Sequence, residues 1–170
     1  MRQRGRKYGL SRPEFSSVEQ LSISNQIWEE LCGIADRSDI EVCGGLFGKV
    51  IGKEIKIFGW KQCQNTVPEI DAFTVDIDEL YSHVEYHEEK PLRLLGLFHS
   101  HPDGEPSLSP MDMHYLNFSS FLWTIMGKVD GKDSWEIKAF AKKGLRPREI
   151  PIVNMLDRSL DNQLGTEVVF

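Results

Sequence analysis

The chain has 170 residues, the usual length of one domain with its own hydrophobic core. Hydrophobic residues make up 40% of it and charged residues 27%, as in an ordinary globular protein, and the formal net charge of −6 disfavours broad nucleic-acid binding. No apolar run is long enough to span a bilayer, and the basic start lacks the apolar stretch of a secretory signal, so we expect no membrane attachment. The three cysteines form no Cys-x-x-Cys pair, which predicts free thiols in a reducing compartment such as the cytoplasm.

The first part of the chain is predicted to be an arm followed by a helix. Residues 1–17 are basic and show no apolar periodicity, so we expect a mobile arm. Residues 22–37 are predicted to form a helix, and Cys32 lies beside its apolar face and is expected to belong to the core. The apolar side chains that recur at helical spacing on this face are Ile23, Ile27, Trp28, Leu31 and Ile34.

The next part is predicted to be a β-hairpin. Residues 42–51 form an apolar, glycine-containing strand, and residues 55–62 are its expected partner across a turn at Gly52 and Lys53. Glu41 precedes the first strand, and a glutamate in that position is by default a surface residue.

Residues 64–72 are predicted to form a polar loop, residues 73–75 a short strand and residues 77–89 a helix. His83 and His87 on this helix are spaced like the two metal ligands of His-Glu-x-x-His proteases. The nearby glutamate does not directly follow the first histidine, however. We therefore interpret this pair as part of a solvated helix face.

A pair of histidines follows a buried strand. Residues 93–98 are short, apolar and bounded by polar residues, which predicts the strand. His99 and His101 come at its end, and side chains two residues apart on a strand point to the same face, so both imidazoles can bind one metal ion. Taken alone, the pair is equally compatible with two surface histidines.

A loop rich in Pro, Gly and Ser separates this pair from a predicted helix start. Ser109 suits the N-cap and Pro110 the first helical position, which places Asp112 in the first turn with its carboxylate directed back towards His99 and His101. Two histidines and an aspartate are the three protein ligands that a catalytic zinc site needs, with the fourth position left for water. The Ser-x-x-Asp segment alone is also a variant of a helix capping box.

The remaining elements are predicted to be a helix over residues 110–117, a central strand over 121–129 and a returning strand over 134–141. Residues 146–153 are expected to form an edge strand, because their prolines suit an edge, and residues 154–170 a tail or a short helix. The helix is expected to turn three side chains into the core: Met111, Tyr115 and Leu116.

Mixed helices and strands with clear hairpins argue against a purely alternating parallel sheet and predict an α+β fold. We expect a curved, mostly antiparallel sheet flanked by helices. This would be one domain over residues 18–153, between the N-terminal arm at 1–17 and the C-terminal segment at 154–170.

Two segments resemble a known protein family. The segment His99-Ser-His-Pro, with seven residues between His101 and Ser109 and two more before Asp112, is similar to the JAMM (MPN-plus) zinc metalloprotease motif. Upstream, Glu41-Val-Cys-Gly-Gly-Leu-Phe-Gly48 resembles the Glu-x-Cys-Gly-x-Leu-x-Gly segment of JAMM deubiquitinases. The resemblance extends over most of the chain and fills every catalytic position of the motif. It implies the MPN (JAB) fold.

The resemblance also implies roles for the residues of the motif. One zinc ion per chain would be bound by His99, His101 and Asp112 and would bring the pKa of its water near neutrality. Glu41 would be the general base that takes the proton of this water and hands it to the leaving amine. Ser109 would donate a hydrogen bond to the developing oxyanion.

The substrate that the resemblance implies is a protein modifier. JAMM enzymes that act on ubiquitin or related β-grasp proteins hold the substrate's C-terminal tail extended along the active-site groove. We therefore expect an isopeptidase that cleaves the amide after the C-terminal Gly-Gly of ubiquitin or a ubiquitin-like modifier, releasing it from a target or processing its precursor. Asn65 and Phe73 are candidate substrate contacts, because in the family their region borders this groove. The short loops are typical of a compact prokaryotic member, and an activating partner or a homodimer is compatible with the sequence.

Two alternatives stay open at this point. One is a JAMM peptidase that acts on a sulfur-carrier adduct or another small peptide substrate. The other is a non-catalytic MPN scaffold, although such scaffolds typically lack the metal ligands that this chain keeps.

Overall fold

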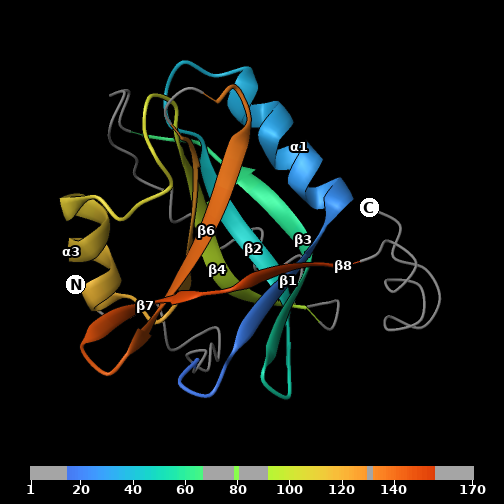
Figure 1. The fold of residues 1–170 in the computed structure, drawn as a ribbon, viewed down its shortest axis with the longest axis vertical. Helices are drawn as coiled ribbons and strands as arrows, with labels where there is room; N and C mark the ends of the chain where they lie inside the picture. Colours follow the sequence, from blue (N-terminus) through green and yellow to red (C-terminus); the bar gives the residue numbers. More distant parts are fainter. Residues whose placement is uncertain (1–14, 67–78, 81–91, 130–131, 156–170) are drawn as a thin grey trace.

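The computed structural model describes residues 15–66, 79–80, 92–129 and 132–155 (Figure 1). These residues form a curved eight-stranded sheet with the strand order β7-β6-β5-β4-β2-β3-β1-β8. Two helices are described with it: α1 (Asn25–Asp36) along one side and α3 (Pro110–Phe118) at the opposite flank (Figure 1). In the described part of the chain, no helix is long and apolar enough to cross a membrane.

The first strand was not expected from the sequence. Residues 22–37 were predicted to be helical throughout, but β1 (Gln20–Ser24) precedes α1 and pairs in parallel with both β3 and β8. The helix begins only after Ser24, whose side chain accepts a hydrogen bond from the backbone N–H of Ile27 as an N-cap. Pairing of β1 with β3 on one side and β8 on the other therefore places Ile23 in a strand, although its spacing from Ile27 fits a helix.

The strands that surround the predicted site agree with the sequence. The hairpin of β2 (Cys43–Ile51) and β3 (Glu54–Cys63) turns at Gly52, whose φ of +61° favours glycine. The strand β4 (Arg93–His101) pairs antiparallel with β2 and in parallel with β5 (Leu122–Lys128). The predicted central strand is therefore confirmed as an interior strand of the sheet.

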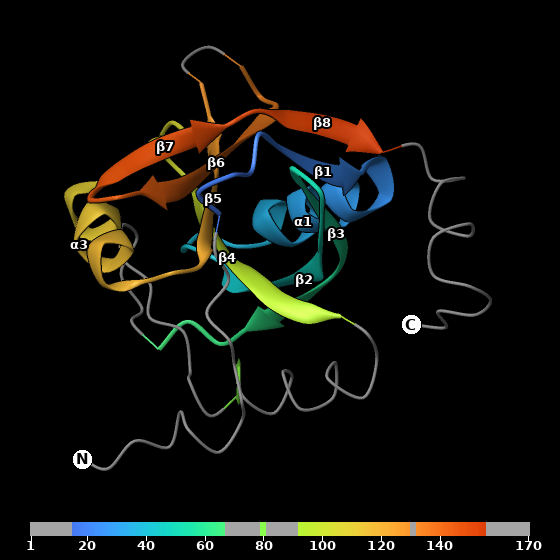
Figure 2. The same ribbon diagram turned by 90° about the horizontal axis from the view of Figure 1, so that it is seen from below.

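The sheet closes on itself through one stretch of chain. The strand β6 (Trp135–Lys143) pairs with β7 (Arg146–Ile150), and β8 (Ile152–Met155) pairs with β1 at the other end of the strand order. Only Pro151 separates β7 from β8, so the two ends of the sheet are joined by a nearly continuous ribbon (Figure 2). A proline here is tolerated because its carbonyl accepts from Leu21 while no N–H is needed.

The main core lies between α1 and the concave side of the sheet. Its buried side chains come from α1 and the strands and include Leu31, Leu46 and Phe98. Phe15 and Val18 are also buried in this cluster. Phe15 lies within residues 1–17, so the range predicted to be an arm includes a residue of the core. Residues 1–14 and 156–170 lie outside the described residues, and the arm and the tail stay predictions.

One core prediction is wrong. Leu116 is buried as expected, but Met111 and Tyr115 on the same helix are 50% and 40% exposed. The helix lies at the flank of the sheet, so only one of its sides meets the protein (Figure 1). The predicted strand at 73–75 and nearly all of the predicted helix at 77–89 lie outside the described residues.

Candidate metal centre

The end of β4 brings two imidazoles together, that of His99 buried and that of His101 half-buried. The Nε2 atoms of His99 and His101 are 3.1 Å apart. The Nδ1 atom of His101 lies 2.9 Å from the backbone oxygen of Glu105, which suits an Nδ1–H donor. That bond leaves Nε2 of His101 with its lone pair available for a metal ion.

The loop that supplies this carbonyl is pressed against β5. A Cβ added at Gly127 would meet backbone atoms of Glu105 and Pro106 at 2.4 Å and the oxygen of Gly104 at 2.5 Å. The backbone N–H of Lys128 donates to the same oxygen of Gly104 at 2.8 Å. Only a glycine at position 127 permits this close approach, and the approach fixes where the carbonyl of Glu105 lies.

The first turn of α3 places Asp112 against both histidines. Ser109 and Asp112 form a reciprocal capping box: the side chain of Ser109 accepts from the backbone of Asp112 at 3.1 Å, and the carboxylate of Asp112 accepts from the backbone of Ser109 at 2.8 Å. The carboxylate oxygens lie 2.9 Å from Nε2 of His99 and 3.5 Å from Nε2 of His101. Pro110 at the first helical position sets the direction of this turn.

A tryptophan on β5 supports the same carboxylate. The Nε1–H of Trp123 donates to Oδ1 of Asp112 at 3.3 Å, and its ring packs edge-on against His99 with the ring centroids 5.9 Å apart. Trp123 therefore limits the movement of one predicted ligand and fills the space beside another.

Glu41 reaches the group from the start of β2. Its Oε1 lies 3.9 Å from Nε2 of His101, and the residue is 4% exposed. Val42 and Ser100 join this end of β2 to β4 by two bonds: the Val42 N–H donates to the Ser100 hydroxyl at 3.0 Å, and the Ser100 N–H donates to the Val42 oxygen at 2.9 Å. Because Ser100 stands between the two histidines in the sequence, these bonds tie Glu41 directly to them.

The charges of the group favour a bound cation. Burial alone would raise the pKa of Asp112, but hydrogen bonds from His101 and His99 hold it well below its usual range. Burial lowers the pKa of His99, which keeps that imidazole neutral, the form that binds metals. Burial also acts to lower the pKa of His101, but hydrogen bonds with Asp112 and the Glu105 carbonyl outweigh it and raise this pKa. The carboxylates thus attract positive charge to the point where the ligand atoms converge.

The ligand atoms also have suitable spacing for a metal ion. One ligand atom each of His99, His101 and Asp112 can be chosen so that all lie within 4.8 Å of one another. Neighbouring ligands of a tetrahedral zinc ion lie about 3.3 Å apart, given metal–ligand bonds of about 2.0–2.1 Å. The distances between the imidazole nitrogens and the carboxylate are 2.9 to 3.5 Å. Within the described residues no other group of three His, Cys, Asp or Glu side chains converges in this way.

The chain matches a known domain family over most of this region. Residues 25–138, more than half of the chain, match the family described as prokaryotic homologs of the JAB domain. The chain belongs to this JAB family. The JAMM resemblance and the α+β MPN (JAB) fold predicted from the sequence are thereby confirmed, although the sheet is more mixed than expected, with four antiparallel and three parallel pairings among the described strands.

Individual relatives agree with the JAB assignment. The chain is 26% identical over 125 residues to a desampylase from Pyrococcus furiosus, an alignment that covers 74% of this chain and 86% of that protein. The solution structure of a protein from Desulfitobacterium hafniense matches with a TM-score of 0.72 at 22% identity, covering 83% of this chain and 98% of the other. A solution structure from Salinibacter ruber matches with a TM-score of 0.59 at 21% identity, covering 87% and 95%. At these identities the two solved structures support the fold alone.

The other residues predicted from the sequence lie beside the metal group or outside the described residues. Ser109 is the N-cap of α3, half-buried at the edge of the metal group. Asn65 lies beside Glu41, because its Nδ2–H donates to the backbone oxygen of Glu41 at 3.1 Å. Phe73, like the pair His83 and His87, lies outside the described residues.

Three residues of the JAB site were not singled out from the sequence. Ser100 lies between His99 and His101, and this position is the one feature of the sequence that could have identified it. Trp123 and Gly127 come from a strand whose apolar sequence predicts burial only. Their roles depend on the parallel pairing of β4 with β5, which places His99 opposite Ile125 and His101 opposite Gly127.

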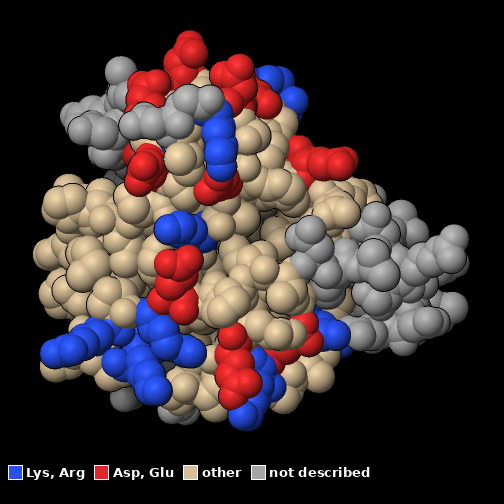
Figure 3. Space-filling view, in the orientation of Figure 1, with Lys and Arg blue, Asp and Glu red and all other residues tan. Residues whose placement is uncertain are grey.

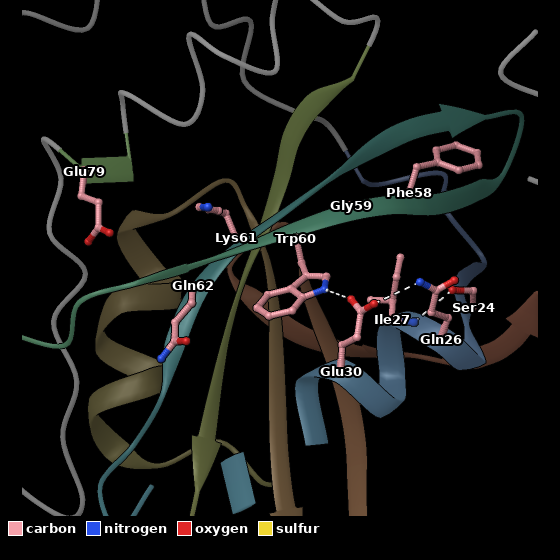
Figure 4. A pocket seen from close by; sticks show the side chains of 10 residues that line it. All are labelled: Ser24, Gln26, Ile27, Glu30, Phe58, Gly59, Trp60, Lys61, Gln62 and Glu79. Atoms are coloured by element: carbon pink, nitrogen blue, oxygen red, sulfur yellow. Dashed lines mark hydrogen bonds between the residues drawn. The ribbon is translucent and has the colours of Figure 1, made fainter. Parts of the chain in front are cut away.

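A separate cavity of about 600 Å³ lies between the start of α1 and β3 (Figure 4). Its lining includes Ile27, Glu30 and Trp60, and the Nε1–H of Trp60 donates to the carboxylate of Glu30 at 2.7 Å. None of its lining residues belongs to the metal group, so the cavity is not where the histidines and Asp112 meet.

Proposed function

We propose that the protein is a zinc-dependent isopeptidase. It would cleave the amide bond after the C-terminal Gly-Gly of ubiquitin or a ubiquitin-like β-grasp modifier, releasing the modifier from a target or processing its precursor. The observation that carries this proposal is the convergence of His99, His101 and Asp112, with Glu41 3.9 Å from His101, in a JAB-family fold. The relative named desampylase supports removal of a conjugated modifier as the reaction class.

In this proposal His99, His101 and Asp112 hold one zinc ion per chain. Neutral imidazole nitrogens and a carboxylate oxygen suit zinc, and three protein ligands leave a fourth position open. Bound there, zinc supplies a water of nearly neutral pKa and polarises an amide carbonyl. Two further hydrogen bonds orient the proposed ligands: His101 donates to the Glu105 carbonyl, and Trp123 donates to Asp112.

Glu41 is the proposed general base. Its carboxylate is buried next to His101 and is not one of the three proposed ligands. In this position it would accept a proton. It takes a proton from the attacking water and passes it to the nitrogen of the departing amine. The two bonds between Val42 and Ser100 hold the backbone next to Glu41 against β4.

Ser109 is the proposed oxyanion donor. Its oxygen accepts the backbone N–H of Asp112, and its side chain also hydrogen-bonds with the Asp112 carboxylate, so the hydroxyl is held beside the metal group. From there it would donate to the oxyanion that develops on the substrate. A donor held in place before reaction stabilises the developing charge by a few kcal/mol, or about a hundredfold in rate.

The extended tail of the modifier is proposed to approach the metal along the region that follows β3. Asn65 is at the border of this region, bonded to the backbone of the proposed base. Phe73 stays a proposed contact from the sequence alone. Cys32, Cys43 and Cys63 are not joined in disulfides, which supports a reducing compartment as the place of action.

The decisive experiment combines metal analysis with a cleavage assay. Zinc is measured by elemental analysis, and a β-grasp protein joined through its Gly-Gly tail to a reporter is incubated with and without a chelator. One zinc per chain and chelator-sensitive cleavage are expected. One zinc without cleavage would favour other amides, such as a sulfur-carrier adduct, and a protein that neither retains zinc nor acts after zinc is added would favour the non-catalytic scaffold.

A further inference from the structure

The solvent-facing side of α3 is apolar. Met111, Tyr115 and Phe118 recur at i, i+4 and i+7, which aligns them along one side of the helix, and they are 50%, 40% and 83% exposed. The ring of His114 lies edge-on to Tyr115 and Phe118, with centroid distances of 5.8 and 5.2 Å. We call these four residues the α3 stripe. Its size and aromatic content make it more than a scatter of single exposed side chains.

No charged side chain interrupts the stripe. A helix at the surface of a globular protein normally carries charged residues on its solvent side, yet Asp112 is the only charged residue in Pro110–Phe118, and it is buried in the metal group. Exposed Tyr, Phe and Met side chains are enriched at protein interfaces. The stripe therefore has the composition of a docking surface.

The turn between β6 and β7 borders the stripe with positive charge. The Nζ of Lys142 donates to the backbone oxygen of Asn117 at 2.6 Å, so this turn lies against the end of α3. Lys143 and Arg146 in the turn are exposed, and Leu145 at its tip is 89% exposed. Figure 3 shows a flank without charged atoms where Figure 1 places α3, with basic residues gathered just below it.

These charges indicate the chemistry of the partner. The chain as a whole has a formal charge of −6, so the basic border is a local feature. An apolar surface edged by lysine and arginine fits an apolar patch edged by acidic side chains on another protein, because complementary charges steer the encounter and fix its orientation.

The stripe starts at the proposed reaction site. Met111 directly precedes Asp112, and the helix rises about 10 Å from Met111 to Phe118. An extended tail of six residues spans about 20 Å. A folded body that rests on the stripe can therefore deliver the end of its own tail to the metal group.

We infer that the α3 stripe docks the folded body of the modifier whose tail is cleaved, through an apolar patch on the modifier that acidic residues surround. This inference rests on the proposed function. The modifier is the component common to every conjugate that such an enzyme cleaves, whereas the targets differ, so a fixed surface beside the site is matched to the modifier.

The test compares two substrates with the same fluorogenic amine. One carries the folded β-grasp protein that the wild type cleaves, and the other carries only a five-residue tail ending in Gly-Gly. The wild type is expected to prefer the folded protein. Phe118→Asp should lower the ratio of kcat/KM for the folded protein to that for the tail peptide about tenfold, through KM, as expected for loss of one interface anchor. Lys143→Glu should lower the same ratio, with a smaller effect at high salt.

The matched control is Ile51→Asp, the same kind of substitution at a hydrophobic residue 47% exposed at the β2–β3 turn, which should keep the wild-type ratio. Zinc content and oligomeric state are measured for each variant. An unchanged ratio in zinc-loaded Phe118→Asp overturns the inference, as does a wild type without preference for the folded protein. A dimer that Phe118→Asp splits into monomers also overturns it, since the stripe would then be a contact between copies. If the wild type cleaves neither substrate, the proposed function fails first and the docking inference falls with it.

Discussion

Two of the proposed ligands are held by hydrogen-bond partners outside the metal group. His101 has the carbonyl of Glu105, and Asp112 has the backbone of Ser109 and the indole of Trp123. Glu41 directly precedes Val42, whose backbone N–H donates to Ser100. Single substitutions can therefore separate metal binding from proton transfer, because the proposed base and the proposed ligands have different supports.

Glu41→Gln is expected to retain zinc and lose turnover. The amide keeps the size of the carboxylate but cannot accept a proton, so kcat should fall at least about a hundredfold while the three ligands stay in place. Zinc content and single-turnover cleavage measure the two effects separately. The control is Glu105→Gln, since Glu105 is exposed and contributes its backbone carbonyl, which the substitution leaves intact. Cleavage at the wild-type rate by Glu41→Gln would remove Glu41 from the role of base.

Gly127→Ala is expected to weaken zinc binding without unfolding the protein. Its Cβ would overlap backbone atoms of Glu105 and Pro106 that lie 2.4 Å away, so the loop must shift and the carbonyl that orients His101 moves with it. Loss of such an outer contact typically weakens metal affinity by about 10- to 100-fold.

Competition of Gly127→Ala with a chromophoric chelator measures its zinc affinity. The matched control is Gly33→Ala, where the nearest atom to an added Cβ is the end of a flexible arginine side chain at 3.4 Å. It lies within α1 and should stabilise that helix by about 0.5–1 kcal/mol. Wild-type zinc affinity in Gly127→Ala would show that the loop position does not control the ligand.

At the scale of elements, the junction of β2 and β4 links the base to the ligands. The N–H of Val42 is buried with the hydroxyl of Ser100 as its acceptor. Ser100→Ala should lower the free energy of unfolding by about 1–3 kcal/mol, because a buried donor loses its partner. It should also lower kcat more than zinc content, since the chain leading into β2 carries Glu41 but none of the proposed ligands. Denaturant unfolding and metal analysis test both, with the exposed Ser107→Ala as the control; an equal loss of zinc and kcat would contradict the separation.

The elements also show what local sequence can predict. The convergence of His99, His101 and Asp112 was predictable because they lie within one short segment where a strand end, a loop and a helix cap determine their directions. Glu41 was identified by family resemblance, since nothing local distinguishes it from a surface glutamate. The strand β1 was missed because its pairing with β3 and β8 is non-local. Tyr115 was wrongly predicted to be buried. The prediction assumed that an apolar side chain on this helix is buried, but the helix packs on the sheet by one side only.

At the scale of the whole molecule, the metal group depends on the folded sheet. The strands β7 and β8 end the strand order, and the chain joins them through Pro151. The proposed ligands come from the end of β4 and the start of α3, which meet only when the chain is folded. A metal ion bound at this point must therefore stabilise the folded state as a whole.

Removal of zinc is accordingly expected to lower the melting temperature. A ligand present at 1,000 times its Kd stabilises the native state by about 4 kcal/mol, which corresponds to roughly 8–16 °C for a chain of this size. Asp112→Ala should lack this difference between zinc and chelator, because the third ligand is gone. Asp103→Ala, which removes an exposed carboxylate from the same loop, should keep it. Thermal unfolding of the three proteins with and without chelator decides the matter: a full zinc-dependent shift in Asp112→Ala, with stoichiometric zinc, would exclude Asp112 from the ligand set.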